Sequence, residues 1–274
     1  MTAPESLFAK CARLIEQADG ILIGAGAGIG VDSGLPDFRG EHGFWKVYPA
    51  LGRAGIRFES IANPEAFESN PKLAWGFYGH RLNLYRQTVP HEGFMILRNI
   101  AAKLPHGAFV YTSNVDGHFQ KAGFGEEHIH ECHGSLHHLQ CLDDSCTREI
   151  WPADDFKPKI DQENRMLLSA PPHCPVCGGL ARPNVMMFGD FSWHPGRQRK
   201  QARRWPEWRH CVTKLVVIEL GAGTDIPSVR RFCESVRAPL IRINPREPQL
   251  GEARGVSLPM GALEAMRGIH ATMP

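Results

Sequence analysis

The sequence lacks the long apolar runs that place a chain in a membrane. No stretch of its 274 residues approaches the roughly 18 consecutive apolar residues that a membrane-spanning helix needs. The N-terminus carries neither the basic flank nor the apolar core of a secretory signal peptide. We therefore expect a cytoplasmic protein without a membrane partner.

The sequence also lacks a marked excess of charge of either sign. It has 31 Lys and Arg residues against 29 Asp and Glu residues, for a net charge of +2. Nucleic acid is therefore not an expected partner of the whole chain. A local basic run at residues 197–209 includes Trp205 and Trp208, and it predicts a solvated helix face or, as an alternative, a surface for nucleic acid or an acidic partner. The sequence does not predict the oligomeric state.

Eight cysteines are present, and four of them occur as C-x4-C and C-x2-C pairs separated by a long spacer. Without a signal peptide, this spacing favours reduced thiols that bind a metal over disulfides. Four thiolates are typical of a structural zinc site and leave no open position for catalysis. The alternatives are buried free cysteines, an iron site, or a histidine (His137, His138 or His173) in place of one cysteine. The predicted zinc ligands are Cys141, Cys146, Cys174 and Cys177.

Four short apolar runs predict strands, at residues 21–23, 109–111, 215–218 and 240–243. Continuous apolar runs of this length suit strands that are buried on both faces, as in a parallel sheet. Each run ends at a glycine or polar motif, and open α/β sheets bind ligands at the carboxyl ends of their strands. Helical spacing at residues 7–18 and 73–86 predicts helices. The pattern indicates an α/β fold with a doubly wound, Rossmann-like parallel sheet.

A glycine-rich segment, residues 24–30, follows the first apolar run. Glycines let the backbone approach a ligand closely, and a helix starting there would favour a pyrophosphate. The segment does not match the G-x-G-x-x-G dinucleotide pattern. It continues into Ser-Gly-Leu-Pro and then Asp37, Phe38 and Arg39. In this form it resembles the first cofactor loop of the sirtuins, the NAD-dependent protein deacylases.

The resemblance continues in order along most of the chain. The further segments that carry it are TSNVD at 112–116, HGS at 133–135, the four paired cysteines, RPNVMMFGD at 182–190, GT at 223–224 and IN at 243–244. It implies a Rossmann-like NAD-binding domain of residues 1–40, 88–136 and 184–274. Residues 41–87 and 137–183 would form a smaller domain from a helical module and a zinc module.

The resemblance implies that the chain uses NAD as co-substrate to remove acyl groups from protein lysine, releasing nicotinamide and O-acyl-ADP-ribose. His133 would be the general base that helps deprotonate a ribose hydroxyl, with His130 as the alternative, and Asn114 would orient a water or the ribose. An Asn-x-Asp turn that caps a helix is the alternative reading of Asn114 and Asp116. The cofactor-binding positions would be Gly26, Ala27, Gly28, Asp37, Phe38, Arg39, Ser113, Asn114, Asp116, Gly223, Thr224 and Asn244.

One departure keeps other activities open. Ser113 stands where the family usually has Gln, so an ADP-ribosyltransferase or an NAD hydrolase on the same scaffold is a second hypothesis. A non-catalytic NAD-sensing or protein-binding module is a third.

The substrate side is predicted from two segments. Residues 185–190 would run extended and pair with the substrate backbone. Val185, Met186, Met187 and Phe188 would line a tunnel for the acylated lysine. Tyr78 and Arg81 lie three residues apart on one helix face and resemble a Tyr-x-x-Arg pair of sirtuins that remove acidic acyl groups such as succinyl. The alternatives are a buried strand and an ordinary helix surface.

Overall fold

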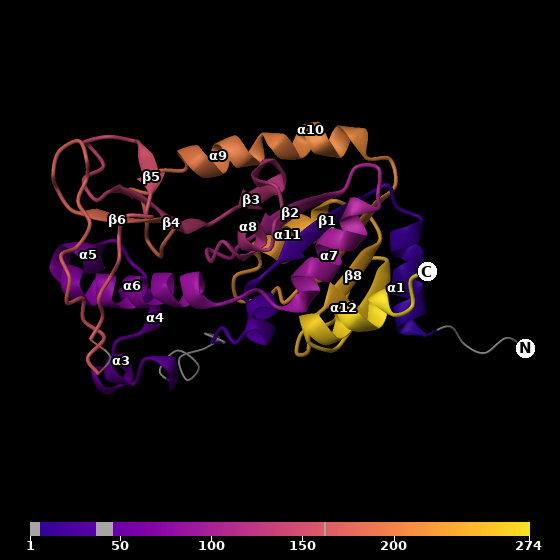
Figure 1. The fold of residues 1–274 in the computed structure, drawn as a ribbon, viewed down its shortest axis with the longest axis horizontal. Helices are drawn as coiled ribbons and strands as arrows, with labels where there is room; N and C mark the ends of the chain where they lie inside the picture. The colour runs from indigo at the N-terminus through magenta and orange to yellow at the C-terminus, as the bar shows by residue number, and fades with distance from the viewer. Residues whose placement is uncertain (1–5, 37–45, 162) are drawn as a thin grey trace, which may run out of the picture.

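The fold is described from a computed structural model, which covers residues 6–36, 46–161 and 163–274 (Figure 1). Within these residues the larger sheet has six strands in the order β3-β2-β1-β7-β8-β9, and every adjacent pair is parallel. The strands are β1 Gly20–Ala25, β2 Ala108–Thr112, β3 Ile129–Glu131, β7 Leu215–Leu220, β8 Leu240–Ile243 and β9 Gly255–Leu258. The order reverses beside β1, as in a doubly wound fold.

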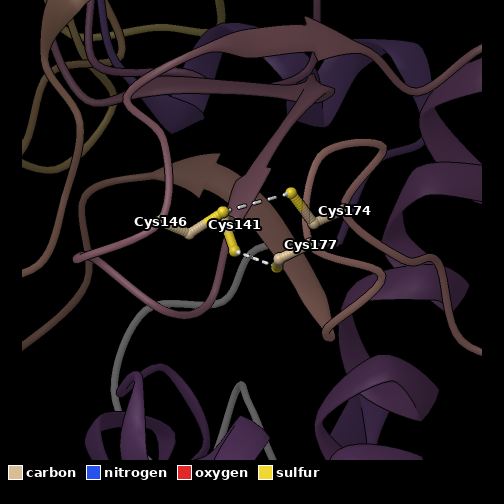
Figure 2. A group of neighbouring side chains, drawn as sticks. All are labelled: Cys141, Cys146, Cys174 and Cys177. Carbon is tan, nitrogen blue, oxygen red and sulfur yellow. Dashed lines mark hydrogen bonds between the residues drawn. The ribbon is translucent and has the colours of Figure 1, made fainter.

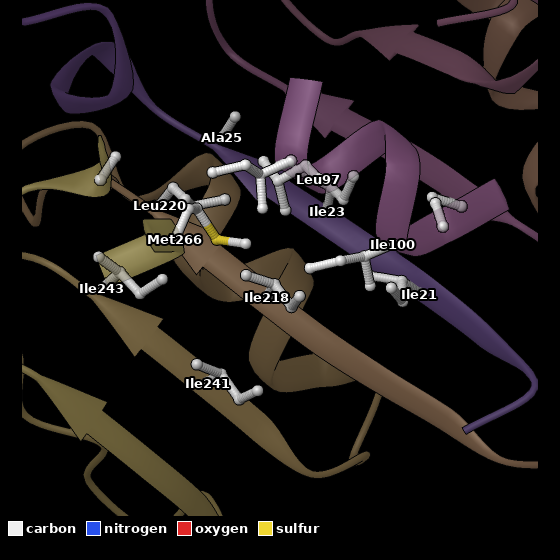
Figure 3. Packing of buried hydrophobic residues seen from close by; sticks show 14 of the residues in the cluster. Ile21, Ile23, Ala25, Leu97, Ile100, Ile218, Leu220, Ile241, Ile243 and Met266 are labelled. Carbon is white, nitrogen blue, oxygen red and sulfur yellow. The ribbon is translucent and has the colours of Figure 1, made fainter. Parts of the chain in front are cut away.

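Helices cover both faces of this sheet, because alternate strand residues point to opposite sides. Ile21 and Ile23 belong to a cluster with α1 (Leu7–Glu16), α7 (Glu92–Ala102) and α12 (Ala262–His270), part of which Figure 3 shows. Leu22 faces the other way, in a cluster with α10 (Arg204–Cys211) and α11 (Ser228–Ser235). The predicted fold class is confirmed.

The smaller region lies at the other end of the molecule (Figure 1). It contains α3 Pro49–Arg53, α4 Phe58–Ile61, α5 Glu65–Ser69, α6 Pro71–Gln87 and an antiparallel sheet of β5 Ile150–Pro152, β4 Gly134–Cys141 and β6 Ala181–Val185. Trp75 of α6 donates its indole N–H to the Ala181 carbonyl at 3.0 Å, which joins the helix to the sheet. Gly76 of α6 lets the backbone of Arg165 pack close to the helix, because a Cβ at position 76 would collide with it.

A third apolar cluster fills this smaller region. It also includes Val115, Val185 and Met187, which the predicted boundaries assign to the larger domain. The core of the smaller region therefore reaches into the site between the two parts. The division into two domains stays a prediction.

The remaining elements are short. They are the 3₁₀ helices η1 Ala27–Ser33 and η2 Glu126–His128 and the helices α8 His118–Lys121 and α9 Gly196–Ala202. The four predicted strands are present, and the predicted helices appear as α1 and within α6. In the described part of the chain, no helix combines the length and apolarity that crossing a membrane requires.

Candidate functional site

The loops after β1 and β7 are packed directly against each other. Gly26 donates its backbone N–H to Leu220 at 3.0 Å, and Gly28 donates to Gly221 at the same distance. A Cβ on Gly26 would lie 2.7 Å from the Ala222 Cα. Gly221 has a φ of +61°, and a side chain there would collide with the Gly28 backbone. The glycines are therefore required for this close approach of two loops.

A cavity of about 90 Å³ opens beside these loops, at the ends of β1, β7 and β8. Its lining includes backbone from Gly28 and Gly221 together with Arg246. Glycine backbone and a guanidinium suit the phosphate and ribose oxygens of a dinucleotide. Ala27 begins the adjoining η1. The residues present at this edge therefore fit the NAD that the sequence predicts.

Asn244 holds the β8 end of this edge together. Its side chain is fully buried, donates to the Ala222 carbonyl at 2.8 Å and accepts the backbone N–H groups of Arg246 and Glu247, each at 3.0 Å. Thr224 donates its hydroxyl to the Glu247 carboxylate, and the neighbouring Gly223 is partly exposed. The predicted adenosine-side residues thus lie in one hydrogen-bonded loop pair.

Asn114 and Asp116 follow β2, next to the loop of β1. The Asn114 amide donates to the Gly26 carbonyl at 3.0 Å, and Ser113 donates its backbone N–H to Ala25 at 3.2 Å. Asp116 accepts the His118 N–H at 2.9 Å, at the beginning of α8. The turn is therefore present, and it also places both side chains at the carboxyl edge of the sheet.

His133 lies between β3 and β4, within reach of the loop after β7. Its Nε2 is 3.2 Å from the Ser228 hydroxyl, at the first residue of α11. Burial lowers the pKa of His133, and a hydrogen bond with the Ser113 backbone opposes that shift. The imidazole is therefore neutral at pH 7 and able to accept a proton.

His130, the alternative base, has different surroundings. Its ring packs edge-on against Tyr111 at 4.9 Å, and its Nε2 lies 2.8 Å from the Gln198 amide. Burial lowers its pKa to about 4. His130 therefore contacts β2 and α9, whereas His133 contacts the β7 loop.

Sequence reasoning missed two residues of this site. Ser228 contacts His133, and only its position shortly after the 223–224 motif could have signalled it. His137 of β4 lies with Nε2 2.9 Å from the Asp116 carbonyl, so that nitrogen is the donor. Its ring also covers Gly117, where an added Cβ would come within 2.9 Å. His137 thereby fixes the turn that carries Asp116.

Three predicted cofactor residues, Asp37, Phe38 and Arg39, lie outside the described residues. The structure therefore adds nothing to their predicted roles.

The predicted extended run over residues 185–190 is shorter than expected. Strand β6 ends at Val185, Met186 donates its N–H to His133 at 2.9 Å, and a turn follows in which Gly189 has a φ of +64°. The cause is Asp190, whose carboxylate is held by the buried Arg182 at 2.8 Å and accepts the Met187 N–H at 3.2 Å. This ion pair folds the segment back on itself.

The side chains of this segment alternate between core and surface. Val185 and Met187 are buried, whereas Met186 and Phe188 are 42% and 39% exposed. Phe188 packs against Phe58 with ring centroids 5.8 Å apart. Met186 and Phe188 therefore both reach the surface, although Phe188 keeps one contact with the core of the smaller region.

Tyr78 and Arg81 of α6 lie in different surroundings. Tyr78 is 2% exposed and stacks on Phe67 at 5.5 Å, and its burial raises the pKa of the phenol. Arg81 donates to the Tyr85 hydroxyl at 2.6 Å and lies 5.3 Å from the centre of the Phe77 ring. Phe77 contacts Phe58, which contacts Phe188, so two ring contacts separate Arg81 from Phe188.

Four sulfur atoms gather beside β4 and β6 (Figure 2). All lie within 4.8 Å of one another, with Cys141 and Cys177 at 3.7 Å and Cys146 and Cys174 at 4.0 Å. A tetrahedral zinc with Zn–S bonds of about 2.3 Å requires sulfur atoms about 3.8 Å apart. The donor set therefore fits zinc.

Of the three histidines weighed as alternative ligands, His137 and His173 are engaged elsewhere, and His138 is not part of the group of neighbouring ligand atoms in the described residues. His137 bonds to Asp116, and His173 lies 2.9 Å from the Gly178 carbonyl. In addition, the Gly179 N–H donates to the Cys177 sulfur at 3.3 Å, as expected where a thiolate is to be stabilised.

Known proteins share this arrangement. The solved structure of a Sir2 homologue mutant with ADP-ribose superimposes with a TM-score of 0.71 at 25% identity, over 96% of this chain and 95% of that one. A Sir2 homologue–NAD complex gives a TM-score of 0.71 at 24% identity, over 99% and 96% of the two chains.

Sequence relatives point the same way. An NAD-dependent protein deacylase of Aquifex aeolicus is 36% identical over 60% of this chain and 59% of its own length. The mitochondrial NAD-dependent protein deacylase sirtuin-5 of Danio rerio is 33% identical over 69% and 63%. The match thus spans about three fifths of the length of these two relatives. An NAD-dependent protein deacylase of Thermus thermophilus is 29% identical over 92% of this chain and 89% of its own length. The Sir2 family model matches residues 26–214, and the chain belongs to the Sir2 family.

Proposed function

We propose that this chain removes acyl groups from protein lysine side chains and uses NAD as the co-substrate. The observation that carries the proposal is that His133 bonds to the Ser113 backbone, next to Asn114, whose amide donates to the Gly26 carbonyl at the edge of the sheet. The relatives named NAD-dependent protein deacylase support it. The products would be nicotinamide and O-acyl-ADP-ribose.

In this proposal each residue has a separate task. NAD supplies the ribose carbon to which the acyl oxygen is transferred. His133 accepts a proton from a ribose hydroxyl, and Asn114 holds the ribose or a water. The Asp116 carboxylate accepts a hydrogen bond from the N–H of the nicotinamide amide. The Gly26–Gly28 backbone and Arg246 bind the phosphate and ribose side, and the exposed Met186 and Phe188 hold the lysine stem.

The cysteine cluster would hold one zinc ion. Four thiolates complete its coordination, so the ion would stabilise the β4–β6 region and take no part in the reaction. The division into two domains and the cytoplasmic location remain part of the same proposal.

The test is product analysis by mass spectrometry with NAD and a panel of acyl-lysine peptides. A deacylase releases nicotinamide only when an acyl peptide is present and forms O-acyl-ADP-ribose in equal amount. Nicotinamide release without peptide would indicate an NAD hydrolase, and transfer of ADP-ribose to protein would indicate a transferase. If no nicotinamide is released under any condition, the non-catalytic NAD-sensing or protein-binding module becomes the favoured hypothesis.

The acyl preference rests on Arg81, which we propose binds a distal carboxylate such as that of succinyl-lysine. A charge-assisted hydrogen bond contributes about 1.5–3 kcal/mol, or roughly tenfold to a hundredfold in specificity. Arg81→Met should therefore lower kcat/KM for succinyl-lysine by that factor and change it little for acetyl-lysine. Because Arg81 also bonds to Tyr85, Tyr85→Phe is the matched control. Equal losses on both substrates would favour plain deacetylation.

A further inference from the structure

A hollow of about 740 Å³ lies on a part of the molecule that the deacylase site does not use. One wall is the β5 edge of the cysteine region, and the other is formed by α9 and the start of α10. Figure 1 shows these two helices running from the β5 end of the molecule toward the larger sheet. Apart from His138, which was weighed as an alternative zinc ligand, none of the candidate site residues belongs to its lining. The lining consists of Glu126, His138, Arg148, Glu149, Ile150, Pro152, Gly196, Arg197, Lys200, Gln201 and Arg204.

Only some of the cations in the basic run at residues 197–209 face this hollow. Arg197 and Lys200, three residues apart on one face of α9, line the hollow together with Arg204, the first residue of α10. Arg199 and Arg203 are exposed and do not line it. The hollow thus receives three cations from the helices and a fourth, Arg148, from the opposite wall.

Two of these four cations are already engaged. Arg197 pairs with the buried Glu131 at 2.5 Å and lies 3.6 Å from Glu126, while Arg204 donates to the Glu126 carbonyl at 2.7 Å. Within the described residues, no carboxylate lies within ion-pair distance of Arg148 or Lys200. These two exposed cations, on facing walls, remain available to negative groups of a ligand.

The aromatic residues of the basic run do not support nucleic acid as that ligand. Trp205 and Trp208 pack inward, with ring centroids 5.3 and 5.7 Å from that of Phe109. Their rings are thus largely used for packing, whereas proteins that bind single-stranded nucleic acid present aromatic rings to the bases. Glu126 and Glu149 on the lining would also repel a continuous phosphate backbone.

We propose that the hollow binds an acidic segment of a partner protein. Its carboxylates would pair with Arg148 and Lys200, and an apolar side chain between them would rest on Ile150 and Pro152. A peptide can alternate carboxylates with apolar groups, and so it matches a lining that mixes cations, two acids and an apolar floor. Binding requires neither NAD nor an acyl group, so it stands apart from the proposed activity.

The test is fluorescence anisotropy with a labelled peptide in which glutamates flank a single leucine, without NAD. Arg148→Gln combined with Lys200→Gln should weaken binding about tenfold or more, because each carboxylate loses a charge-assisted partner. The matched control, Arg199→Gln combined with Arg203→Gln, removes the same charge outside the hollow and should change the Kd less than about twofold. Both variants should keep the wild-type melting temperature and zinc content.

Three results would overturn the proposal. Equal weakening by both double variants would show general attraction to a basic surface. Equal binding of the peptide with glutamine in place of glutamate would exclude the role of carboxylates. Tighter binding of a single-stranded oligonucleotide, lost in the Arg148 and Lys200 variant, would assign the hollow to nucleic acid.

Discussion

The two regions that meet at the candidate site are stabilised in different ways. The carboxyl edge of the large sheet is held by backbone hydrogen bonds between loops, such as Gly28 to Gly221, above two extensive apolar clusters. The cysteine end of the smaller sheet has four sulfur atoms in place of a comparable core. The edge of the large sheet is preorganised by the fold, whereas the cysteine end of the smaller sheet would be held by a metal.

This difference separates the residues proposed to act on NAD from the cysteines proposed to stabilise the fold. The groups proposed to bind NAD lie on loops whose backbone is already paired, so little is reorganised when a ligand binds. His133 belongs to the junction, since it precedes β4 of the smaller sheet and contacts Ser228 of the larger region. Its position therefore depends on both.

The largest expected effect comes from removing the group at that junction. His133→Ala should lower deacylation by about 10²- to 10⁴-fold, the usual contribution of a general base, and leave NAD binding largely intact. Turnover and NAD binding by calorimetry would be measured in parallel. His130→Ala is the matched control and should retain most activity. Full turnover by a folded His133→Ala protein would remove this residue from the mechanism.

The next largest effect should separate the two regions directly. Removal of the metal, or Cys146→Ser, should unfold the loops that carry the cysteines while the parallel sheet remains folded, because those loops would lose the metal that joins them. Hydrogen exchange would show lost protection at the cysteine end of β4 and β6 and unchanged protection at β1 and β7. Active protein that contains no tightly bound ion would contradict the zinc assignment.

Lowering the pH should have a smaller effect on the free energy of unfolding, and this effect should come from histidines in both regions. Burial lowers the pKa of His80 and of His130 to about 4 each, from an ordinary value of 6.5. Between pH 6.5 and 4 the unfolded chain therefore binds protons that the folded chain does not, so the free energy of unfolding falls as pH falls through this window. Urea denaturation at pH 7, 5.5 and 4.5 measures it.

Urea denaturation of two histidine variants can assign this loss of stability to one region or the other. His80→Gln removes a protonation from α6, and His130→Gln removes one from β3; each should flatten the pH dependence. A denaturation midpoint that is constant from pH 7 to 4.5 in the unsubstituted protein would disprove the prediction.

The smallest effect concerns the contact that joins β4 to the Asp116 turn. His137→Phe keeps an aromatic ring over Gly117 but removes the donor to the Asp116 carbonyl, and such a bond contributes about 0.5–1.5 kcal/mol. KM for NAD should rise about twofold to tenfold with kcat less affected. His137→Gln, which can still donate, should restore part of the loss. An unchanged KM in the Phe variant would limit His137 to packing.

Much of the fold followed from local pattern. The four apolar runs became β1, β2, β7 and β8 because residues buried on both faces need no alternation. Strand β9 was missed because its Gly-Val-Ser-Leu sequence carries a weak signal. The run expected through residue 190 turns at residues 188 and 189 because Asp190 pairs with a buried arginine that no local pattern reveals.

The sequence by itself determined the glycine loop, the order of the motifs and the paired cysteines, because each depends on residues that are close along the chain. Only the tertiary structure decided which of two neighbouring histidines meets Ser228, 95 residues away, and that Trp205 and Trp208 face the core. It also placed Tyr78 in the core and Arg81 against Tyr85. Such contacts depend on how whole elements pack, and packing sums many weak interactions between residues far apart in sequence.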